Sequence, residues 1–488
     1  MTENRTPRLP WLTKVIYGTG DWGLAAFNTL RQIFYAIFLT DVVGLEPRLA
    51  SFAAFVGVLW DAINDPLVGI LSDRTRTRWG RRRPFLLIFA VPYGLAFLAL
   101  WWAPPIHNQI LLMVYIMLAY AFSDTLQTLV IVPFHALTPE MTPDYDERTS
   151  LAGYRMFFNF LASIVIAMGA PMIIDAVMAG GGTQQQGYAL AAMAFGATAV
   201  VPYLLIFFTV RERPAAERPV EIITLRQTAR IAWRNVPFRY ATALYMLNWV
   251  TFDLLGIALP YLLVYWVARG NLLAKVPGLG LPIESAVLGM MMVTATLVLP
   301  FWIWLAKRLG KTTAYIIALV FWAALLLCVP WIPQGAYALT LVLAVAIGIS
   351  VSAAHVLPDA IFPDVIEWSE LRTGRRHEGV YYGAKNFVRK LTTAIAIFLA
   401  LQVLGWLGYK TPPEGATQVT QPASAMWGIR LLVGPIGAAL LIVTIIVALA
   451  YPLDKKRFDR VRRLLAQRQQ RAARRRTAKL PPSEAQET

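Results

Sequence analysis

Residues 49–84 of the chain read LASFAAFVGVLWDAINDPLVGILSDRTRTRWGRRRP. The first two thirds of this stretch form an apolar run of the length, about 20 residues, that crosses a bilayer as an α-helix. The rest is a short loop that contains six arginines from Arg74 to Arg83. The carboxylates of Asp61 and Asp65 interrupt the apolar run, and ionisable groups in a membrane helix usually serve function. This stretch alone therefore predicts an integral membrane protein with a site inside the bilayer.

Composition extends this prediction to the whole chain. Of its 488 residues, 57% are hydrophobic and 15% are charged, whereas about a quarter of the residues in soluble domains are charged. The net charge of +17 does not indicate nucleic-acid binding, because the positive residues lie in short loops and a tail between apolar runs. The single cysteine excludes a disulfide framework, and the four scattered histidines lack the spacing of metal ligands.

Twelve apolar runs reach membrane length, so the sequence predicts an all-α integral membrane protein with 12 transmembrane helices. The loops after the second, sixth, eighth and tenth runs are rich in arginine and lysine, and the intervening loops are poor in both. By the positive-inside rule both termini are expected in the cytoplasm, and the expected location is the bacterial inner membrane. The approximate bounds of the runs are 16–41, 49–71, 84–103, 109–136, 151–177, 188–210, 238–268, 284–306, 312–332, 336–362, 379–408 and 428–452.

The longest polar stretch inside the chain, residues 211–237, is predicted to be a central cytoplasmic loop. It divides the protein into an N-terminal six-helix half, residues 1–210, and a C-terminal six-helix half, residues 238–452. Two such halves around a central cavity are typical of secondary transporters. The basic tail, residues 453–488, is expected to be a solvated cytoplasmic extension attracted to anionic lipid headgroups; the alternative is a specific partner.

Asp61 and Asp65 are four residues apart, so they share one face of the second predicted helix, and Asn64 adjoins that face. A rise of 1.5 Å per residue from Ser51 places them roughly 15–20 Å into the membrane, near its midplane. Two carboxylates and an amide oxygen are hard ligands that suit Na⁺, or a proton shared between close acids. We therefore predict a metal-ion or proton site here; the alternative is a structural salt bridge to a basic residue on another helix.

Lys390 lies about 18 Å into the eleventh predicted helix, counted from Glu378, and so also reaches the midplane. A buried lysine needs a counter-charge, which Asp61 or Asp65 would supply. A lysine that pairs with these acids when the cation is absent, and releases them when it binds, would couple ion occupancy to conformation. The alternative is a static salt bridge.

Arg31 lies in the middle of the first predicted helix, where a guanidinium suits a carboxylate or phosphate of a substrate. The alternative is a pair with a protein carboxylate such as Asp253. The other predicted substrate contacts are Asp21, Tyr35, Asp253, His355 and Tyr382. The predicted gating residues are Asp73, Arg81, Arg155, Asp364 and Arg375.

Several motifs, spread over both halves, resemble one transporter family. WDAINDP at 60–66 and TRTRWGRRRP at 75–84 resemble the second helix and following loop of the glycoside–pentoside–hexuronide:cation symporters. This family belongs to the major facilitator superfamily, so the resemblance implies the major facilitator fold. Further similar segments are 17–21, 40–45, 132–137, 363–367 and 373–379.

The resemblance implies a site for Na⁺, Li⁺ or H⁺. The family's cation ligands correspond to Asp61, Asn64, Asp65 and Thr128 of this chain, and its coupling lysine corresponds to Lys390. These are the same residues that their depth and spacing single out, with Thr128 added.

The family's sugar site does not carry over. The two acidic residues that hold sugar hydroxyls in melibiose permease-like members correspond here to Ala25 and Ile131, whose side chains accept no hydrogen bond. Segments 127–138 and 147–156 also resemble the branch of the family that includes the animal Na⁺-dependent lysophosphatidylcholine symporter.

The predicted function is cation-coupled symport, with Na⁺ or H⁺, of a small organic solute by alternating access. The resemblance implies a sugar, glycoside or hexuronide; the alternative is Na⁺-dependent symport of an anionic amphiphile such as a lysophospholipid. No cofactor is expected besides the co-transported cation, and the expected partners are the solute, a monovalent cation and the bilayer, with the protein a monomer. An enzyme is not expected, because the predicted spans contain no nucleophile–base pair or metal cluster. A channel or receptor would need a pore motif or an output domain.

Overall fold

The computed structural model describes residues 9–142, 144–212, 233–374, 378–413, 416–453 and 457–467, apart from 462 and 466. Each long element of secondary structure in these residues is a helix. The helices are α1 (Trp11–Gly18), α2 (Gly20–Ile37), η1 (Phe38–Val42), α3 (Pro47–Arg74), α4 (Arg83–Leu100), α5 (Gln109–Met141), α6 (Tyr145–Ala179), α7 (Gln184–Thr209), α9 (Val236–Tyr261), η2 (Leu262–Val267), α10 (Ile283–Leu309), α11 (Lys311–Cys328), η3 (Val329–Trp331), α12 (Tyr337–Thr373), α13 (Glu378–Trp406), α14 (Ala423–Leu431), η4 (Leu432–Ile436) and α15 (Gly437–Leu449).

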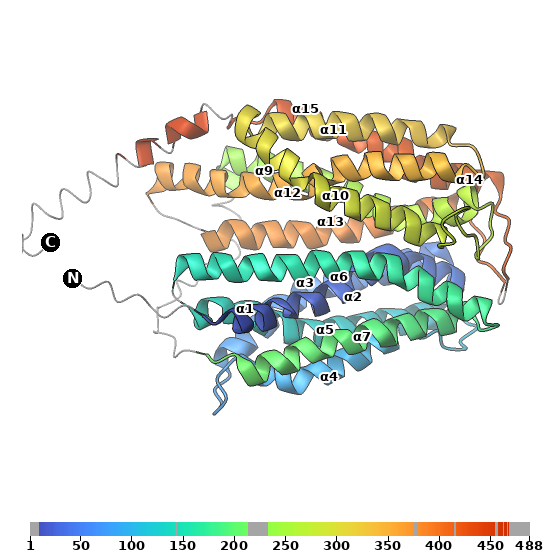
Figure 1. The fold of residues 1–488 in the computed structure, drawn as a ribbon, viewed down its shortest axis with the longest axis horizontal. Helices are drawn as coiled ribbons and strands as arrows, with labels where there is room; N and C mark the ends of the chain where they lie inside the picture. The colour runs from blue at the N-terminus through green and yellow to red at the C-terminus, as the bar shows by residue number, and fades with distance from the viewer. Residues whose placement is uncertain are drawn as a thin grey trace, which may run out of the picture.

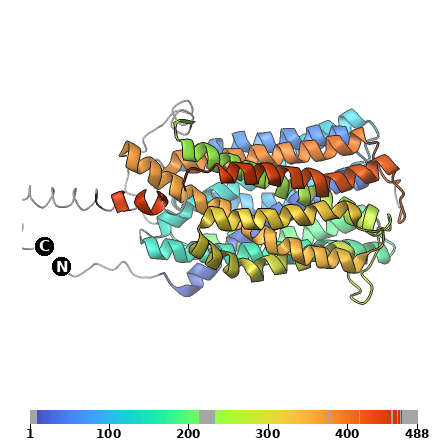
Figure 2. The same cartoon turned by 90° about the horizontal axis from the view of Figure 1, so that it is seen from above.

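The long helices run side by side in two groups, with α1–α7 in the lower part and α9–α15 in the upper part of Figure 1. The view turned by 90° (Figure 2) shows the same near-parallel bundle from above. Among the described residues the groups contact each other chiefly where α3 packs against α13, α6 against α10 and α2 against α9. We call the end of the bundle that carries the α3–α4 loop, residues 75–82, the arginine-rich end.

The described part of the chain contains 11 helices that are long and apolar enough to cross a membrane, where the sequence predicts 12. The difference is the first predicted span, 16–41, which forms α1, α2 and η1. Polar residues such as Asp21, Asn28 and Arg31 make α2 less apolar than the other spans, yet most of it is buried against α6, α7 and α9. A helix enclosed by protein does not need an apolar surface, so its polar residues are available to a site.

Close packing brings α3 and α5 together beside the predicted cation site. A Cβ atom on Gly57 would lie 2.3 Å from the ring of Tyr120, so only glycine permits this approach. One turn further along α3, the indole of Trp60 donates a hydrogen bond of 2.9 Å to the hydroxyl of Thr125 on α5. These contacts place the acidic turn of α3 against the middle of α5.

The start of α9 is tied to α13, which matters because both helices carry charged residues of the site. Asn235 caps α9 by accepting the backbone N–H of Phe238 at 3.3 Å. Its amide also donates a hydrogen bond of 3.0 Å to the hydroxyl of Tyr381 on α13. The cap therefore fixes the relative position of the two helices at the arginine-rich end.

Candidate cation site and substrate cavity

Lys390 on α13 lies between the two acids of α3. Its Nζ is 2.7 Å from Oδ1 of Asp61 and 2.5 Å from Oδ2 of Asp65, and it also donates to the backbone carbonyl of Asp61 at 2.9 Å. Thr128 on α5 is buried, and its side chain lies beside the Asp65 carboxylate. The Lys390 ammonium thus occupies the position between the carboxylates that a cation would need.

Asn64 lies on the same helix turn and is 4% exposed. Its Nδ2 has no hydrogen-bond partner among the described residues. The structure therefore brings Asp61, Asp65, Thr128 and Lys390 into contact, with the Asn64 amide buried beside them.

Arg31 pairs with Asp124 on α5, at 3.3 Å between Nη1 and Oδ1, and not with Asp253, which the sequence offers as one alternative. The guanidinium carbon lies 4.8 Å from the ring centroid of Phe27 and 4.9 Å from that of Tyr120. Both distances are within the range of cation–π attraction. Arg31 is therefore held by a carboxylate and two rings of the protein.

The formal charges of the acidic and basic side chains around Lys390 do not balance. Asp61, Asp65 and Asp124 supply three carboxylates, whereas Lys390 and Arg31 supply two basic groups, which leaves one formal negative charge. An unbalanced charge in a low-dielectric interior is unfavourable. One monovalent cation would neutralise the group, and a divalent cation would leave it positive.

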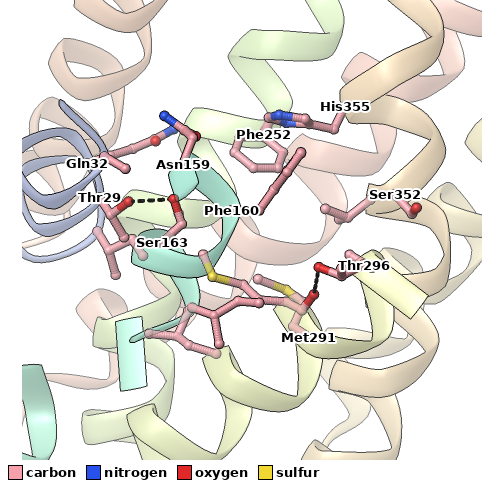
Figure 3. Close-up of a pocket in the computed structure, with 18 of the residues that line it drawn as sticks. Thr29, Gln32, Asn159, Phe160, Ser163, Phe252, Met291, Thr296, Ser352 and His355 are labelled. Atoms are coloured by element: carbon pink, nitrogen blue, oxygen red, sulfur yellow. Dashed lines mark hydrogen bonds between the residues drawn. The ribbon is translucent and has the colours of Figure 1, made fainter. Parts of the chain in front are cut away.

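A cavity of about 260 Å³ lies beside this cluster, between α2 and α6 of one group and α9, α10, α12 and α13 of the other. Most of its lining is apolar, including Phe160, Phe252 and Met291 (Figure 3). On its α2–α6 side the hydroxyl of Thr29 donates to that of Ser163 at 3.1 Å. The cavity thus combines an apolar interior with a few neutral hydrogen-bonding groups, as ligand pockets usually do.

The charged member of the cavity wall is Arg389 on α13. Its guanidinium holds both oxygens of Asp253 on α9, at 2.6 and 2.9 Å, and lies 4.0 Å from the ring centroid of Trp249. Asp253 is fully buried and also accepts hydrogen bonds from Gln32, at 2.6 Å, and Thr393, at 2.9 Å. Because the aspartate neutralises the arginine, this pair adds no net charge to the cavity.

The predicted substrate contacts fall in different places. His355 lines the cavity, where its ring packs beside those of Trp249 and Phe252. Asp253 reaches the cavity through Arg389, which lines it.

The other predicted substrate contacts do not line the cavity. Asp21 binds the guanidinium of Arg155 at 3.1 and 3.2 Å, nearer the arginine-rich end. Tyr35 is fully buried in an aromatic cluster with Trp101. Tyr382 is 40% exposed and lies near Lys385.

Four of the five predicted gating residues take part in ion pairs at the arginine-rich end. Arg81 binds Glu140 at 2.7 Å, Asp364 binds Lys311 at 2.6 Å, Asp73 pairs with Arg82, and Arg155 pairs with Asp21. Arg375 lies outside the described residues.

Glu212 closes this end of the first helix group. Its carboxylate accepts the backbone N–H groups of Arg81, Arg82 and Arg83, at 2.7, 2.8 and 2.7 Å. We expect Glu212→Gln to lower the free energy of unfolding by about 1–3 kcal/mol, since hydrogen bonds to a charged acceptor are each worth roughly that amount. Thermal unfolding of the purified protein measures the change. Glu46→Gln is the matched control, because the Glu46 side chain is 54% exposed and should leave the melting temperature unchanged.

Two charged residues of the site received no role from the sequence: Asp124 and Arg389. Each is an ionisable residue in or at the end of a predicted span, which is the available signal. Their partners lie on other helices, so the sequence does not reveal what they hold.

The fold is that of the major facilitator superfamily. A proton-dependent oligopeptide transporter is similar to this chain with a TM-score of 0.63 at 11% identity, covering 93% of this chain and 98% of that one. A variant of the nucleoside transporter NupG gives 0.62 at 11% identity, covering 90% of this chain and 100% of that one.

Sequence comparison is more specific than the fold. The model of a family described as MFS/sugar transport protein matches residues 16–455. An uncharacterized symporter of Synechocystis, sll1374, is 30% identical, with 95% of this chain and 98% of that protein covered. The sodium-dependent lysophosphatidylcholine symporter 1-A of Danio rerio is 27% identical (93% and 88%), and the putative glycoside/cation symporter YagG of Escherichia coli is 26% identical (93% and 94%).

The chain therefore belongs to the MFS/sugar transport protein family, which confirms the resemblance in its motifs. It is a multi-pass membrane transporter of the cation-coupled symporter type, and not an enzyme.

Proposed function

We propose that the chain couples the movement of one monovalent cation, Na⁺ or H⁺, to that of an organic solute. Asp61, Asn64, Asp65 and Thr128 hold the cation, and Lys390 is the coupling group. The observation that carries this proposal is the Lys390 ammonium seated between Asp61 and Asp65 in a cluster with one excess negative charge. A cation that enters must displace the ammonium, so ion binding and the α3–α13 contact are linked.

The solute occupies the cavity between the two helix groups in this proposal. By family resemblance it is a sugar, glycoside or hexuronide, and the putative glycoside/cation symporter supports that class. The second candidate is an amphiphile such as a lysophospholipid, as the name of the Danio rerio relative suggests. The lining favours a solute with a substantial apolar part, because Ala25 lines the cavity where sugar-binding members have an acid. Because Asp253 neutralises Arg389, the cavity suits an uncharged solute as well as an anionic one.

Counterflow in proteoliposomes tests the proposal. Purified protein loaded with an unlabelled glycoside, hexuronide or lysophospholipid should accumulate the labelled compound, and an inward Na⁺ or proton gradient should increase the uptake. Binding without exchange would contradict a carrier, and exchange that no cation gradient changes would contradict symport.

We propose further that the arginine-rich end faces the cytoplasm, with residues 1–210 and 238–452 as the two rocking halves. At the opposite end, Asp41 of η1 accepts hydrogen bonds from Tyr265 of η2 and, at 2.6 Å, from Tyr409. Burial raises the pKa of the Tyr409 phenol well above its ordinary value, so this hydroxyl keeps its proton and donates it. Asp41 therefore fastens the two halves to each other at this end, and its role is to close the cavity there.

Removal of both hydroxyls, in the Tyr265→Phe/Tyr409→Phe variant, should open this end. Each hydrogen bond to a carboxylate contributes about 1.5–3 kcal/mol, so the closed population should fall at least about tenfold relative to the open one. Spin labels on cysteines at the exposed positions Glu46 and Leu279, in a Cys328→Ser background, measure the separation by double electron–electron resonance.

Tyr451→Phe is the control for this variant, because Tyr451 is also buried but its hydroxyl has no partner among the described residues. Its distance distribution should match that of the parent protein. An unchanged distribution in the double variant would contradict the closing role of Asp41.

A further inference from the structure

One oxygen of a buried carboxylate beside the cation site has no partner. Asp124 is 1% exposed, and its Oδ1 binds Arg31 at 3.3 Å. Its Oδ2 has no hydrogen-bond partner among the described residues. A buried acceptor without a donor is unfavourable, so it needs an explanation.

The orientation of Asp124 is imposed from two sides. The Arg31 guanidinium, held between the rings of Phe27 and Tyr120, fixes Oδ1. The bond from the Trp60 indole to the neighbouring Thr125 ties this turn of α5 to the acidic turn of α3. These contacts hold Oδ1 on Arg31 and leave Oδ2 without a partner among the described residues.

Lys390 is the group that needs such an acceptor. Its ammonium makes three contacts with Asp61 and Asp65. Asp124 shares a face of α5 with Thr128, four residues further along, and Thr128 lies beside the Asp65 carboxylate that holds the ammonium. A cation bound by Asp61 and Asp65 displaces the ammonium, which then lies in a low-dielectric region without a counter-charge. Such a buried, unpaired charge is strongly unfavourable.

We propose that Asp124 is a positioning residue that receives Lys390 through its free Oδ2 when the cation takes the lysine's place. This inference rests on the proposed function and deepens it, because it names where the coupling group goes. When the cation binds, Lys390 exchanges its contacts with Asp61 and Asp65 for a contact with Asp124. Because α13 carries Lys390, this movement shifts α13 relative to α3.

Cation binding without solute tests the proposal on the full-length protein. The probe is a titration with NaCl or LiCl against choline chloride at constant ionic strength, read as the stabilisation against heat that a ligand of the native state produces. Asp124→Asn keeps the shape but removes the charge that attracts the ammonium. We expect it to weaken cation binding at least about tenfold, because a neutral acceptor binds an ammonium less strongly than a carboxylate does.

A double-mutant cycle separates this role from a general effect of the Asp124 charge or from a structural role. In the Lys390→Gln background no ammonium needs a new partner, so adding Asp124→Asn should change cation affinity by less than about twofold. An equal loss in both backgrounds would overturn the proposal, and so would undiminished affinity in Asp124→Asn alone.

The failure of the inference is distinguishable from that of the proposed function. If Asp65→Asn loses the cation response while Asp124→Asn keeps it, ligation by Asp61 and Asp65 stands, whereas the role of Asp124 and its place in the charge balance do not. If neither Na⁺ nor Li⁺ stabilises the parent protein and no proton gradient increases uptake in counterflow, the proposed function and this inference both fail. Glu147→Gln, which removes a buried carboxylate paired with Lys14 far from the site, controls for nonspecific loss and should keep the parental response.

Discussion

We expect Na⁺, or another monovalent cation, to stabilise the parent protein, and the Asp65→Asn variant to lose this stabilisation. The reason is the charge balance of the cluster around Lys390. With three carboxylates and two basic groups, a bound cation brings the cluster to neutrality. With Asp65 neutral, the same cation would leave one buried positive charge.

The expected loss is large. The side chains of Lys390 and Asp65 are 19% and 40% exposed, so the loss corresponds to the contacts given up, about 1.5–3 kcal/mol for a hydrogen bond to a charged group. Each 1.4 kcal/mol changes a binding constant about tenfold, so cation affinity should fall about ten- to a hundredfold. Asp61→Asn should behave alike, because Asp61 contacts the same ammonium at 2.7 Å.

Thermal unfolding at increasing NaCl or LiCl, with choline chloride holding ionic strength constant, measures this loss. The control is Asp175→Asn, which removes a buried carboxylate paired with Lys275 at 3.1 Å, remote from Lys390. It should keep the parental cation response whatever its own stability. Undiminished stabilisation of both Asp61→Asn and Asp65→Asn would contradict the site.

The geometry of the acidic turn was accessible from the sequence because it lies within one helix. A separation of four residues places Asp61 and Asp65 on the same face in any helix, and the structure has both within reach of Lys390. The depth of these residues along their helices also predicted the contact between Lys390 and the two acids, since all three reach the midplane and each charge needs a counter-charge.

The other ion pairs depend on how helices are placed side by side, which local periodicity does not contain. Arg31 had two plausible kinds of partner, and it lies against Asp124 because α2 packs near α5 at this depth. Asp253 instead meets Arg389 across the α9–α13 contact. Each helix exposes several candidate faces, so only the tertiary arrangement selects the pairs and the cavity that they border.

The first helix illustrates the limit of hydropathy. Its polar residues lower its hydropathy below that of the 11 spans found among the described residues. The fold tolerates them because α2 is enclosed by α6, α7 and α9. Three of the side chains that weaken the membrane signal, Asn28, Thr29 and Gln32, line the cavity. Low hydropathy in an otherwise membrane-length helix is thus itself an indication of a site.

The ion pair between Asp253 and Arg389 provides the second large expected effect, on folding. Asp253 is fully buried and bound by both guanidinium nitrogens, Gln32 and Thr393. Asp253→Asn would leave the Arg389 charge uncompensated between α9 and α13. We expect the free energy of unfolding to fall by about 3–5 kcal/mol, the usual effect of breaking a buried pair by removing one partner.

The double variant Asp253→Asn/Arg389→Gln should recover most of this stability, because neither remaining side chain is charged and the amides can bond to each other. The fraction of monodisperse protein that survives heating in detergent measures both variants. Glu46→Gln is the control: it breaks a surface pair with Arg48 in which both side chains are at least half exposed, so the change should stay below about 1 kcal/mol. If the single Asp253 variant were as stable as the parent, Arg389 would have to be solvated from the cavity. The charge of Arg389 would then be available to an anionic solute, which would favour a hexuronide or an anionic amphiphile over a neutral glycoside.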